Sequence, residues 1–286
     1  MGVIKIGEKA SLSQQFATFI EGFKDASGES TYLEQEIRNQ PPFILDFSDL
    51  YSFNGELAFT LLSNPRQALK AFGQAVSNTD ADIAKIHVRR IPQATPIRSM
   101  GSSMMGSLVM VKGIVVKASE DTSRVKVARY RCAMCGNQVD EEQVNHFLRE
   151  PAEKCEECDE RKWVFMPESS TYRDSQNITI QETPEQLSSG EIPRKLDIVL
   201  LDELVKICNP GDLVEVTGIV AVRQQAPNSF RLDLERIMEG NHVEVLNKQD
   251  DGVNLSQKDK DEITQLSLDP RILSRLIHSL APSIYA

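Results

Sequence analysis

Four of the five cysteines fall into two matched pairs, and their spacing is the strongest chemical signal in the chain. Cys132 and Cys135 are followed, after nineteen residues, by Cys155 and Cys158. Each C-x2-C pair offers two thiolates from one tight turn, and two such turns complete a tetrahedron around zinc. Gly136, directly after the first pair, helps the turn to fold back on the metal. We therefore predict one structural Zn²⁺ per chain, held by these four cysteines.

Two disulfides or a redox centre are the alternatives for the same cysteines. The N-terminus lacks the layout of a signal peptide and no run of eighteen apolar residues occurs, so we expect an intracellular protein. In a reducing compartment, paired cysteines more often bind metal than form disulfides. A redox motif is disfavoured because there are two pairs and no thioredoxin-like pattern around them. His146 is a competing ligand, and Cys208 is expected to be a small buried hydrophobe.

A zinc ion closed by four thiolates has no open position for a catalytic water. The chain also contains no GxSxG, HExxH or GxGxxG motif. Residues 101–106 have the glycine spacing of a P-loop, but Ser107 and Leu108 stand where a lysine and a hydroxyl are required. We expect no enzymatic activity from this chain. The rival hypothesis, an enzyme that acts on nucleic acid through zinc, requires an open metal site.

The charge is distributed unevenly. The chain is 286 residues long, its net charge is -10, and 40% of its residues are hydrophobic, which is ordinary for a soluble globular protein. Residues 101–131 carry six basic side chains against two acidic ones, whereas residues 132–165 carry four against nine. The basic strip is suited to phosphate, and the acidic metal lobe is better suited to another protein surface.

The elements that must position these residues can be read from periodicity. The first hundred residues are mainly helical, with an apolar stripe at Phe16, Phe19, Ile20 and Phe23 and an Asn64-Pro65 helix start; residues 43–47 could form a short strand. From about residue 106 the period changes to two. Strands are predicted at 107–117, 124–131, 178–180, 196–201, 213–223 and 230–234.

A glycine-bearing first strand and long connections indicate an OB-type barrel interrupted by an insertion, with a plain β-sandwich as the alternative. The predicted fold class is α+β. A helical subdomain (1–100) precedes an OB-fold (101–131 and 166–247) with a β-hairpin near 220–233, a zinc-binding insertion (132–165), and a linker with short C-terminal helices (248–286). Those helices are expected at 256–267 and from 269 toward 279.

Three segments resemble the N-terminal half of the MCM (minichromosome maintenance) replicative helicases. They are ITIQETPEQLSSGEIPR (178–194), VLLDELV (199–205) and PGDLVEVTG (210–218), and the order of helical subdomain, OB strands, four-cysteine insertion and hairpin also matches. The resemblance covers nearly the whole chain. It is most similar to the single archaeal form, which implies a cytoplasmic, chromosome-associated protein.

The resemblance implies a DNA-binding, ring-forming collar. Such a collar binds single-stranded and double-stranded DNA largely without sequence specificity, and it forms a homo-hexamer or a double hexamer. The last residues, Ala281 to Tyr285, resemble the junction where the family's AAA+ ATPase begins, so the full-length protein is expected to be an ATP-dependent DNA helicase. The alternative function is a zinc-stabilised interaction module that joins rings and makes only minor DNA contact.

The resemblance also implies site residues. Arg124 and Arg129 match basic strand residues that grip single-stranded DNA, and Arg194, with Lys195 beside it, matches a further basic position. Thr179 stands where the family has a basic residue, which predicts a weaker or shifted grip. Because Arg129 lies five positions after Arg124, the two side chains lie on opposite faces of a regular strand, so both reach DNA only if the strand bends or twists.

The predicted hairpin resembles the one that lines the family's central channel. Its tip, residues 224–229, lacks the usual basic residues, so Arg223 and Arg231 at its flanks are the candidates for DNA contact, together with Lys117 and Lys126 of the basic strip. Residues 182–193 resemble the loop that communicates between the collar and the ATPase ring. The loop positions implied are Gln181, Glu182, Gly190 and Pro193.

Overall fold

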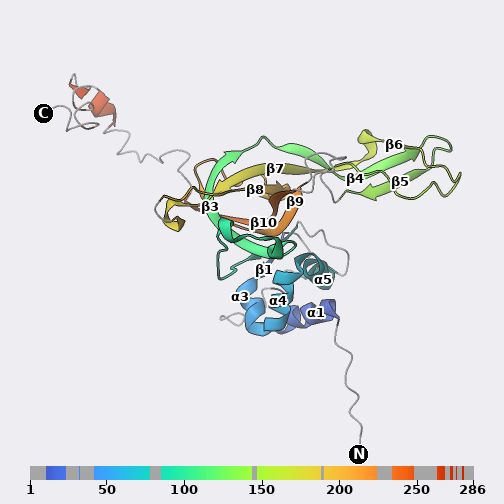
Figure 1. The fold of residues 1–286 in the computed structure, drawn as a ribbon, viewed down its shortest axis with the longest axis horizontal. Helices are drawn as coiled ribbons and strands as arrows, with labels where there is room; N and C mark the ends of the chain where they lie inside the picture. Colours follow the sequence, from blue (N-terminus) through green and yellow to red (C-terminus); the bar gives the residue numbers. More distant parts are fainter. Residues whose placement is uncertain are drawn as a thin grey trace, which may run out of the picture. The chain divides into compact units, whose positions relative to one another are not determined.

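The computed structural model describes residues 11–23, 32, 42–77, 85–143, 147–187, 190–223, 234–247, 263–267, 271, 272, 275 and 279. The chain divides into two compact units, residues 1–247 and 248–286 (Figure 1). In the second unit residues 263–267 are helical, within the first predicted C-terminal helix. Across the described residues, no helix is both long enough and apolar enough to span a membrane.

The helical part of the first unit combines short helices with a parallel strand pair. Its described elements are α1 (Leu12–Gly22), β1 (Phe43–Asp46), α3 (Phe47–Phe53), α4 (Gly55–Ser63), α5 (Pro65–Ser77) and β2 (Ile86–Arg89). Ser11 begins α1 with a capping box, and the Asn54 side chain accepts two backbone N–H bonds at the start of α4. α5 begins at Pro65, as predicted. β2, which pairs with β1, was not predicted from the sequence.

The predicted apolar stripe forms the core of this helical part. Five aromatic and aliphatic side chains from α1 and α5 are at most 1% exposed: Phe16, Phe19, Ile20, Leu69 and Phe72. The rings of Phe16 and Phe72 meet edge to face at 5.6 Å, which joins the two helices. Phe23, at the end of the stripe, packs against the same core from a partly buried position. The stripe is therefore a packing feature.

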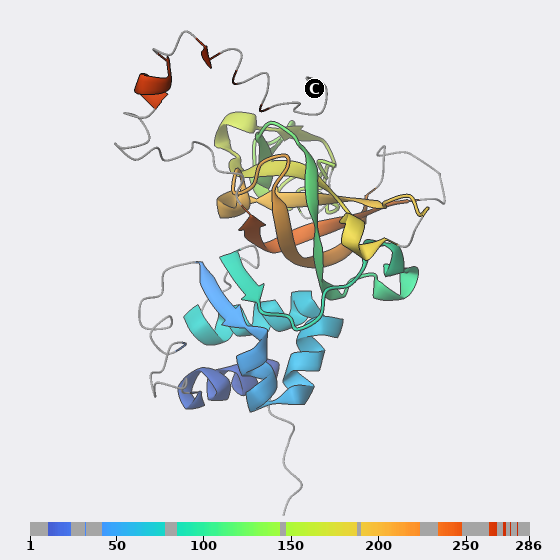
Figure 2. The ribbon, with the colours of Figure 1, turned by 90° about the vertical axis from the view of Figure 1, so that its left-hand side faces the viewer.

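Five long strands form a closed barrel (Figures 1 and 2). They are β3 (Leu108–Ala118), β7 (Thr171–Gln181), β8 (Lys195–Leu201), β9 (Leu213–Arg223) and β10 (Glu235–Asn247). Pairing runs β3–β9–β10–β8–β7, and β7 pairs back with β3. All of these pairs are antiparallel except β8 with β10. This closed five-stranded arrangement confirms the predicted OB-type barrel over the plain sandwich.

The first barrel strand bends at its glycine to close the ring. Residues 108–114 of β3 pair with β9, and residues 114–118 pair with β7. A side-chain carbon on Gly113 would lie 2.6 Å from the carbonyl oxygen of Gln181, so the approach of β7 requires glycine here. The barrel interior is filled by side chains such as Val111, Ile178 and Ile198, and Cys208 is buried in the same cluster, as predicted.

The inserted lobe begins in the second half of one long strand. β4 (Thr122–Cys132) pairs with β7 over residues 122–127, and from Val127 onward with β5 (Gln138–Glu142) and then β6 (Trp163–Phe165). The β4–β7 register shifts between Val125 and Val127, as at a β-bulge. The two halves of β4 therefore belong to different structures: the first half extends the barrel wall, and the second half is the stem of the lobe (Figure 1).

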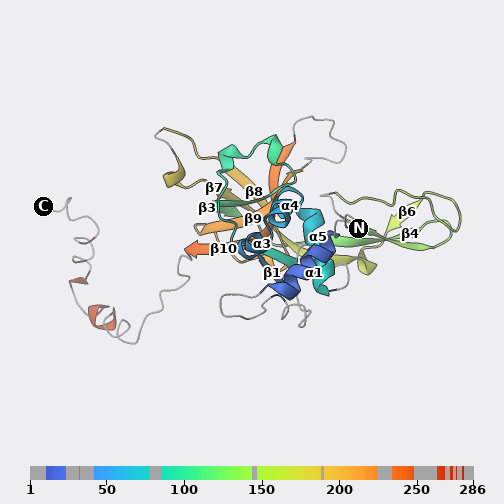
Figure 3. The same ribbon diagram turned by 90° about the horizontal axis from the view of Figure 1, so that it is seen from below.

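Seen from below, the helices of the helical part lie in front of the barrel strands (Figure 3). Buried polar and apolar contacts attach the two parts. The amide of Asn241 on β10 donates to the carbonyl of Ile86 at 2.6 Å and accepts from the Val88 N–H at 2.7 Å, so it pairs with the backbone of β2. Leu108 and Ile219, on the outer surface of the barrel, belong to the core cluster of the helical part. Both kinds of contact bury backbone or apolar surface that would otherwise face water.

Candidate metal centre and nucleic-acid interface

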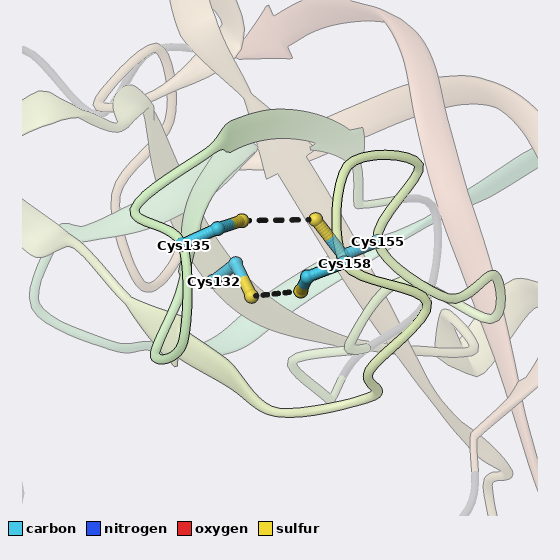
Figure 4. A group of neighbouring side chains, drawn as sticks. All are labelled: Cys132, Cys135, Cys155 and Cys158. Carbon is cyan, nitrogen blue, oxygen red and sulfur yellow. Dashed lines mark hydrogen bonds between the residues drawn. The ribbon is translucent and has the colours of Figure 1, made fainter.

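The four predicted cysteines converge in the lobe (Figure 4). Their sulfur atoms all lie within 4.8 Å of one another, with Cys132 3.5 Å from Cys158 and Cys135 3.4 Å from Cys155. Tetrahedral zinc with bonds of about 2.3 Å places its sulfurs about 3.8 Å apart. The cysteines are free thiols without disulfide bonds. The spacing of the donor set therefore fits a tetrahedral thiolate-bound ion.

Two turns of the same design present the sulfurs. The Gly136 N–H donates to the Cys132 carbonyl at 3.0 Å, and the Asp159 N–H donates to the Cys155 carbonyl at 2.8 Å. Both turn residues have positive φ, 81° for Gly136 and 57° for Asp159. Glycine and aspartate are among the residues that tolerate this left-handed conformation. Asp159 thus has the same place in the turn after the second cysteine pair that Gly136 has after the first.

The electrostatics of the cluster favour a bound cation. Backbone N–H groups of Cys135 and Met134 lower the pKa of Cys132 to about 6. At Cys158 the backbone at Glu160 acts in the same direction, but burial and the neighbouring sulfurs outweigh it and raise the pKa to about 12. Four thiols this close cannot all ionise without a counter-charge, because each thiolate repels the next. A divalent ion supplies that charge.

The lobe has little apolar core of its own. No described residue of the lobe belongs to either hydrophobic core cluster, and the main buried apolar contact in its stem is that of Tyr130 with Phe165. Met134, Leu148 and Val164 are instead exposed, at 61%, 49% and 46%. A module of this size with so small an apolar core needs another source of stability, and a four-thiolate metal site is a common one. The four cysteines could therefore bind a metal ion that folds the lobe.

OB barrels in general bind oligonucleotides on one face of the barrel. In OB barrels, oligonucleotides bind across the second and third strands and the loops that join strands one to two and four to five. Here those strands are β7 and β8. The first loop contains β4 and the lobe, and the second loop, residues 224–234, follows Arg223. Those of the predicted basic residues that the structure describes therefore lie around a single face of the barrel, apart from Arg129 in the lobe stem.

Arg124 lies at the barrel end of β4, half-buried and directly opposite Arg173 of β7. Burial lowers the pKa of Arg124; the charge of Glu239 opposes this effect and the charge of Arg173 adds to it. Arg129 lies beyond the bulge, in the stem of the lobe. Its guanidinium donates two bonds of 2.7 Å to Asp140, and this contact lowers the pKa of Asp140. Arg124 therefore lies in the half of β4 that pairs with β7, whereas Arg129 lies in the half that pairs with β5.

Arg223, at the end of β9, is held by two carboxylates. Its Nη2 lies 2.9 Å from Glu235 Oε2 and 3.3 Å from Asp197 Oδ2. The hydroxyl of Thr179 donates to the other oxygen of Asp197 at 2.7 Å. Lys117 pairs with Thr179 across the β3–β7 ladder, so its side chain lies on the same outer face. The acid-lined position of Arg223 was not predicted.

The remaining basic candidates occupy different positions. Lys195 is exposed at the start of β8, opposite Gln181, and Lys126 is half-buried on β4 next to the bulge. Arg194 precedes β8, and its backbone N–H donates to Glu182 at 3.0 Å. Arg231 and the hairpin tip lie outside the described residues, as does His146.

The loop after β7 is anchored by one buried carboxylate. The side chain of Glu182 is fully buried and accepts from the Arg98 backbone N–H at 3.0 Å and from the Arg98 guanidinium at 3.1 and 2.9 Å. Arg98 lowers the pKa of Glu182 to about 2, and burial opposes that effect. Arg98 also bonds to Glu191 farther along the loop. Gly190 adopts a positive φ of 86°, and Pro193 is half-buried.

Arg98 was missed in the sequence. It follows Pro96-Ile97 in a short 3-10 turn, Ile97–Ser99, eighty-four positions before its partner. No periodicity connects residues so distant in sequence. Glu182, which directly follows the β7 pattern, was an indirect signal. A carboxylate that becomes buried in the fold needs a basic partner, so its position indicated that such a partner exists.

Comparisons with known proteins identify the family. The MCM N-terminal domain matches residues 13–123, and the MCM OB domain matches residues 96–224. The minichromosome maintenance protein MCM of Saccharolobus solfataricus is 32% identical over 94% of this chain. The chain belongs to the MCM family. MCM relatives from eukaryotes are named DNA replication licensing factors, among them Mcm2 of Drosophila melanogaster (29% identical over 99% of the chain) and mcm2 of Schizosaccharomyces pombe (27% over 97%).

The matches cover only part of each MCM relative. The chain spans 42% of the Saccharolobus protein, 34% of the Drosophila protein and 36% of the Schizosaccharomyces protein. The MCM N-terminal and OB domains thus account for the helical part and much of the barrel described above.

Proposed function

We propose that this chain is the DNA-binding and ring-organising N-terminal part of an MCM replicative helicase. It contacts DNA phosphates through the basic residues around β7 and β8, largely without regard to sequence. The observation that carries the proposal is the position of Arg124, Lys195, Lys117 and Arg223 around the oligonucleotide-binding face of an OB barrel in an MCM-family chain.

The proposal extends to assembly and to the whole protein. Six copies form a ring, singly or as a double hexamer, that presents this cationic face to single-stranded or double-stranded DNA at the chromosome. The full-length protein adds an AAA+ ATPase domain, and the loop from Gln181 to Pro193 transmits its state to the collar. The anchoring of this loop by Glu182 and Arg98 supports such a role, because a transmitting loop needs a rigid base.

The metal in the lobe is proposed to be Zn²⁺, one per chain, bound by Cys132, Cys135, Cys155 and Cys158. Four thiolates close the coordination shell, so the ion acts by folding the lobe. Spectra of a Co²⁺-substituted sample test the ligand set. Four thiolate ligands and no solvent-exchangeable position are expected, and an open position would instead support the rival hypothesis of a zinc-dependent enzyme.

The DNA contact is tested by fluorescence anisotropy with a labelled oligothymidylate at low salt. Arg124→Ala is expected to weaken binding about tenfold, because one charge-assisted phosphate contact contributes about 1.4 kcal/mol. Arg129→Ala should have a smaller effect, because Asp140 already occupies that guanidinium. Affinity should fall with salt, since phosphate contacts release counterions. Unchanged affinity of the Arg124→Ala/Arg129→Ala double variant would remove these residues from the interface.

A second function has one observation in its favour. Met134, Leu148 and Val164 expose apolar surface on an otherwise acidic lobe, which suits contact between lobes of two rings more than contact with phosphate. In that case the chain is chiefly a zinc-stabilised module that joins rings. Native mass measurements with and without a chelator, each with and without single-stranded DNA, separate the two functions. If chelation halves the mass of the assembly while DNA affinity stays constant, the result supports ring joining by the lobe.

A further inference from the structure

A belt of polar side chains crosses the outer face of the barrel at the end of β9. Arg223 on β9 faces Glu235 on β10 across the ladder, and its Nη2 lies 2.9 Å from Glu235 Oε2 and 3.3 Å from Asp197 Oδ2 on β8. The Thr179 hydroxyl of β7 donates to the other Asp197 oxygen at 2.7 Å. The residues on either side of Thr179 and Asp197 fill the barrel interior, so these two side chains point outward.

The belt keeps hydrogen-bonding capacity for a ligand. The side chains of Arg223, Asp197 and Glu235 are 26%, 34% and 41% exposed. Their mutual contacts use Nε and Nη2 of Arg223 and Oε2 of Glu235. Within the part of the chain that the structure describes, Arg223 Nη1 and Glu235 Oε1 make no hydrogen bond. A donor of the arginine and an acceptor of the glutamate therefore remain available.

The charges around the belt suit two different parts of a DNA strand. Lys195, two positions before Asp197 on β8, is exposed on the same face, and Lys117 of β3 pairs with Thr179. These lysines attract phosphate groups. Asp197 and Glu235 repel phosphate, so on a DNA-binding face they suit a group that donates hydrogen bonds. Within a DNA strand the bases carry such donors, whereas the phosphates carry only acceptors.

The four bases differ in the donors that they offer. Guanine has two adjacent donor groups on its Watson–Crick edge, N1–H and the N2 amino group, beside the acceptor O6. Thymine has a single N–H there, and adenine and cytosine each have one amino group. Unpaired bases can present this edge to protein side chains. One carboxylate accepts both guanine donors in parallel while an arginine N–H donates to O6, so an arginine beside two carboxylates complements guanine best.

We propose that Arg223, Asp197 and Glu235 recognise an unpaired guanine of single-stranded DNA. They thereby add a base preference to a face that otherwise contacts phosphates, and the hydrogen bond from Thr179 orients Asp197 for this contact. The inference rests on the proposed function, from which it takes single-stranded DNA as the ligand. It deepens that function by assigning the acidic residues of the DNA-binding face to the bases and the lysines beside them to the phosphates.

The test compares oligonucleotides of equal length, so that the phosphate contribution cancels. Anisotropy at low salt measures binding of the 286-residue chain to oligothymidylate and to the same oligonucleotide with isolated guanines, adenines or cytosines. The guanine oligonucleotide should bind about fivefold more tightly than oligothymidylate, at the lower end for one base contact because water competes at a partly exposed site. Inosine lacks the N2 amino group, so replacement of guanine by inosine should remove most of the preference.

Two variants assign the preference to the carboxylates. Asp197→Asn and Glu235→Gln keep the shape of each side chain but cannot accept two donors in parallel, so each should reduce the guanine preference to about twofold or less. Neither should weaken binding to oligothymidylate, since each removes a charge that repels phosphate. Asp159→Asn in the lobe is the matched control, because it removes the same charge from an exposed pair with Lys154, and it should retain the full preference. Circular dichroism melts establish that each variant folds.

The remaining outcomes separate this inference from the proposed function. If the wild-type chain binds all four oligonucleotides equally, or if both carboxylate variants keep the guanine preference, the guanine site is wrong and the proposed function stands. If the wild-type chain binds none of them at low salt, the proposed function itself fails. Guanosine monophosphate is the other source of the same base. Saturable binding of this nucleotide that Asp197→Asn abolishes, with no base preference among the oligonucleotides, would assign the site to a free nucleotide and overturn the DNA assignment.

Discussion

At the scale of single residues, several charged side chains of this chain are held by partners from other strands or loops. Arg223 lies between Asp197 and Glu235, Arg129 is bound by Asp140, and Glu182 is bound by Arg98. Each pair fixes a side chain in one orientation, but it also competes with any external ligand for the same charges. The acidic partners are therefore expected to set the strength of DNA binding as much as the arginines do.

Removal of an acidic partner should strengthen DNA binding. Asp197→Asn leaves Arg223 with a single carboxylate partner and frees donor capacity for phosphate, so we expect about a two- to fivefold gain in affinity for single-stranded DNA. Anisotropy at low salt measures it. Asp159→Asn in the lobe removes the same charge from an exposed pair and serves as the control. An equal gain in both variants would mean that only the net charge matters.

Glu182 should stabilise the loop that follows β7. Glu182→Gln keeps the shape of the side chain but removes the charge that Arg98 binds, so we expect a loss of about 2 kcal/mol in the free energy of unfolding. The folded-state pKa, about 2, lies below the usual 4.5. The wild-type advantage is therefore complete above that usual value and disappears as pH falls through the folded-state pKa.

Denaturant titrations across this pH range, with amide exchange at Arg98 and Arg194, measure the effect. Faster exchange of both amides in Glu182→Gln is expected, because each N–H donates to the Glu182 carboxylate. The same stability difference at low and neutral pH would exclude the charge as its cause.

At the scale of elements, β4 links two structures that are stabilised in different ways. Its first half belongs to a barrel with a continuous apolar interior, and its second half carries a lobe whose described residues contribute to neither hydrophobic core cluster. The lobe should therefore depend on its metal, whereas the barrel should not.

Chelation should unfold the lobe selectively. The chain has a single tryptophan, Trp163 in β6, whose indole N–H donates to the Glu153 carbonyl at 3.2 Å, so its fluorescence reports on the lobe alone. Removal of metal, or Cys135→Ser, should shift the Trp163 emission to the red while the far-ultraviolet circular dichroism and melt of the barrel change little. Addition of one equivalent of Zn²⁺ should restore the emission of the wild-type chain only.

At the scale of the whole first unit, the helical part and the barrel meet across a buried polar contact. Asn241 pairs with the backbone of β2, and beside it the rings of His87 and His242 lie 5.7 Å apart. Burial lowers the pKa of His242 from its usual 6.5, and the charges of His87 and Arg89 act in the same direction, while those of Glu244 and Asp46 oppose them. Glu203 lies 3.8 Å from His87.

Acid should weaken this contact. Because the folded-state pKa of His242 is depressed, the unfolded chain binds the proton more readily, so stability declines once pH falls below 6.5. A loss on the order of 1 kcal/mol between about pH 7 and about pH 5 is expected. Urea unfolding followed at both pH values measures it, and His242→Gln should reduce the dependence. An unchanged pH dependence in this variant would assign the effect to other groups.

Features set by local spacing could be predicted from the sequence. The two cysteine pairs, the apolar stripe through Phe16 and Phe19, the Asn64-Pro65 helix start and the bend at Gly113 each depend on residues a few positions apart, and the chain geometry is then fixed by turn chemistry or periodicity. The family resemblance added the order of the parts. β2 was missed because four residues with an unremarkable pattern become a strand only beside β1.

The sequence by itself identified the four cysteines that converge in the lobe, and it predicted the barrel type. Only the tertiary structure decided which charged side chains are paired: closure of the barrel brings Arg223 to Asp197, the packing of the helical part brings Arg66 to Glu239, and the turn after Pro96 brings Arg98 to Glu182. These contacts join positions 26 to 173 residues apart. The physical reason is that electrostatic attraction acts over a few ångströms in space, whereas a sequence pattern records only neighbours along the chain.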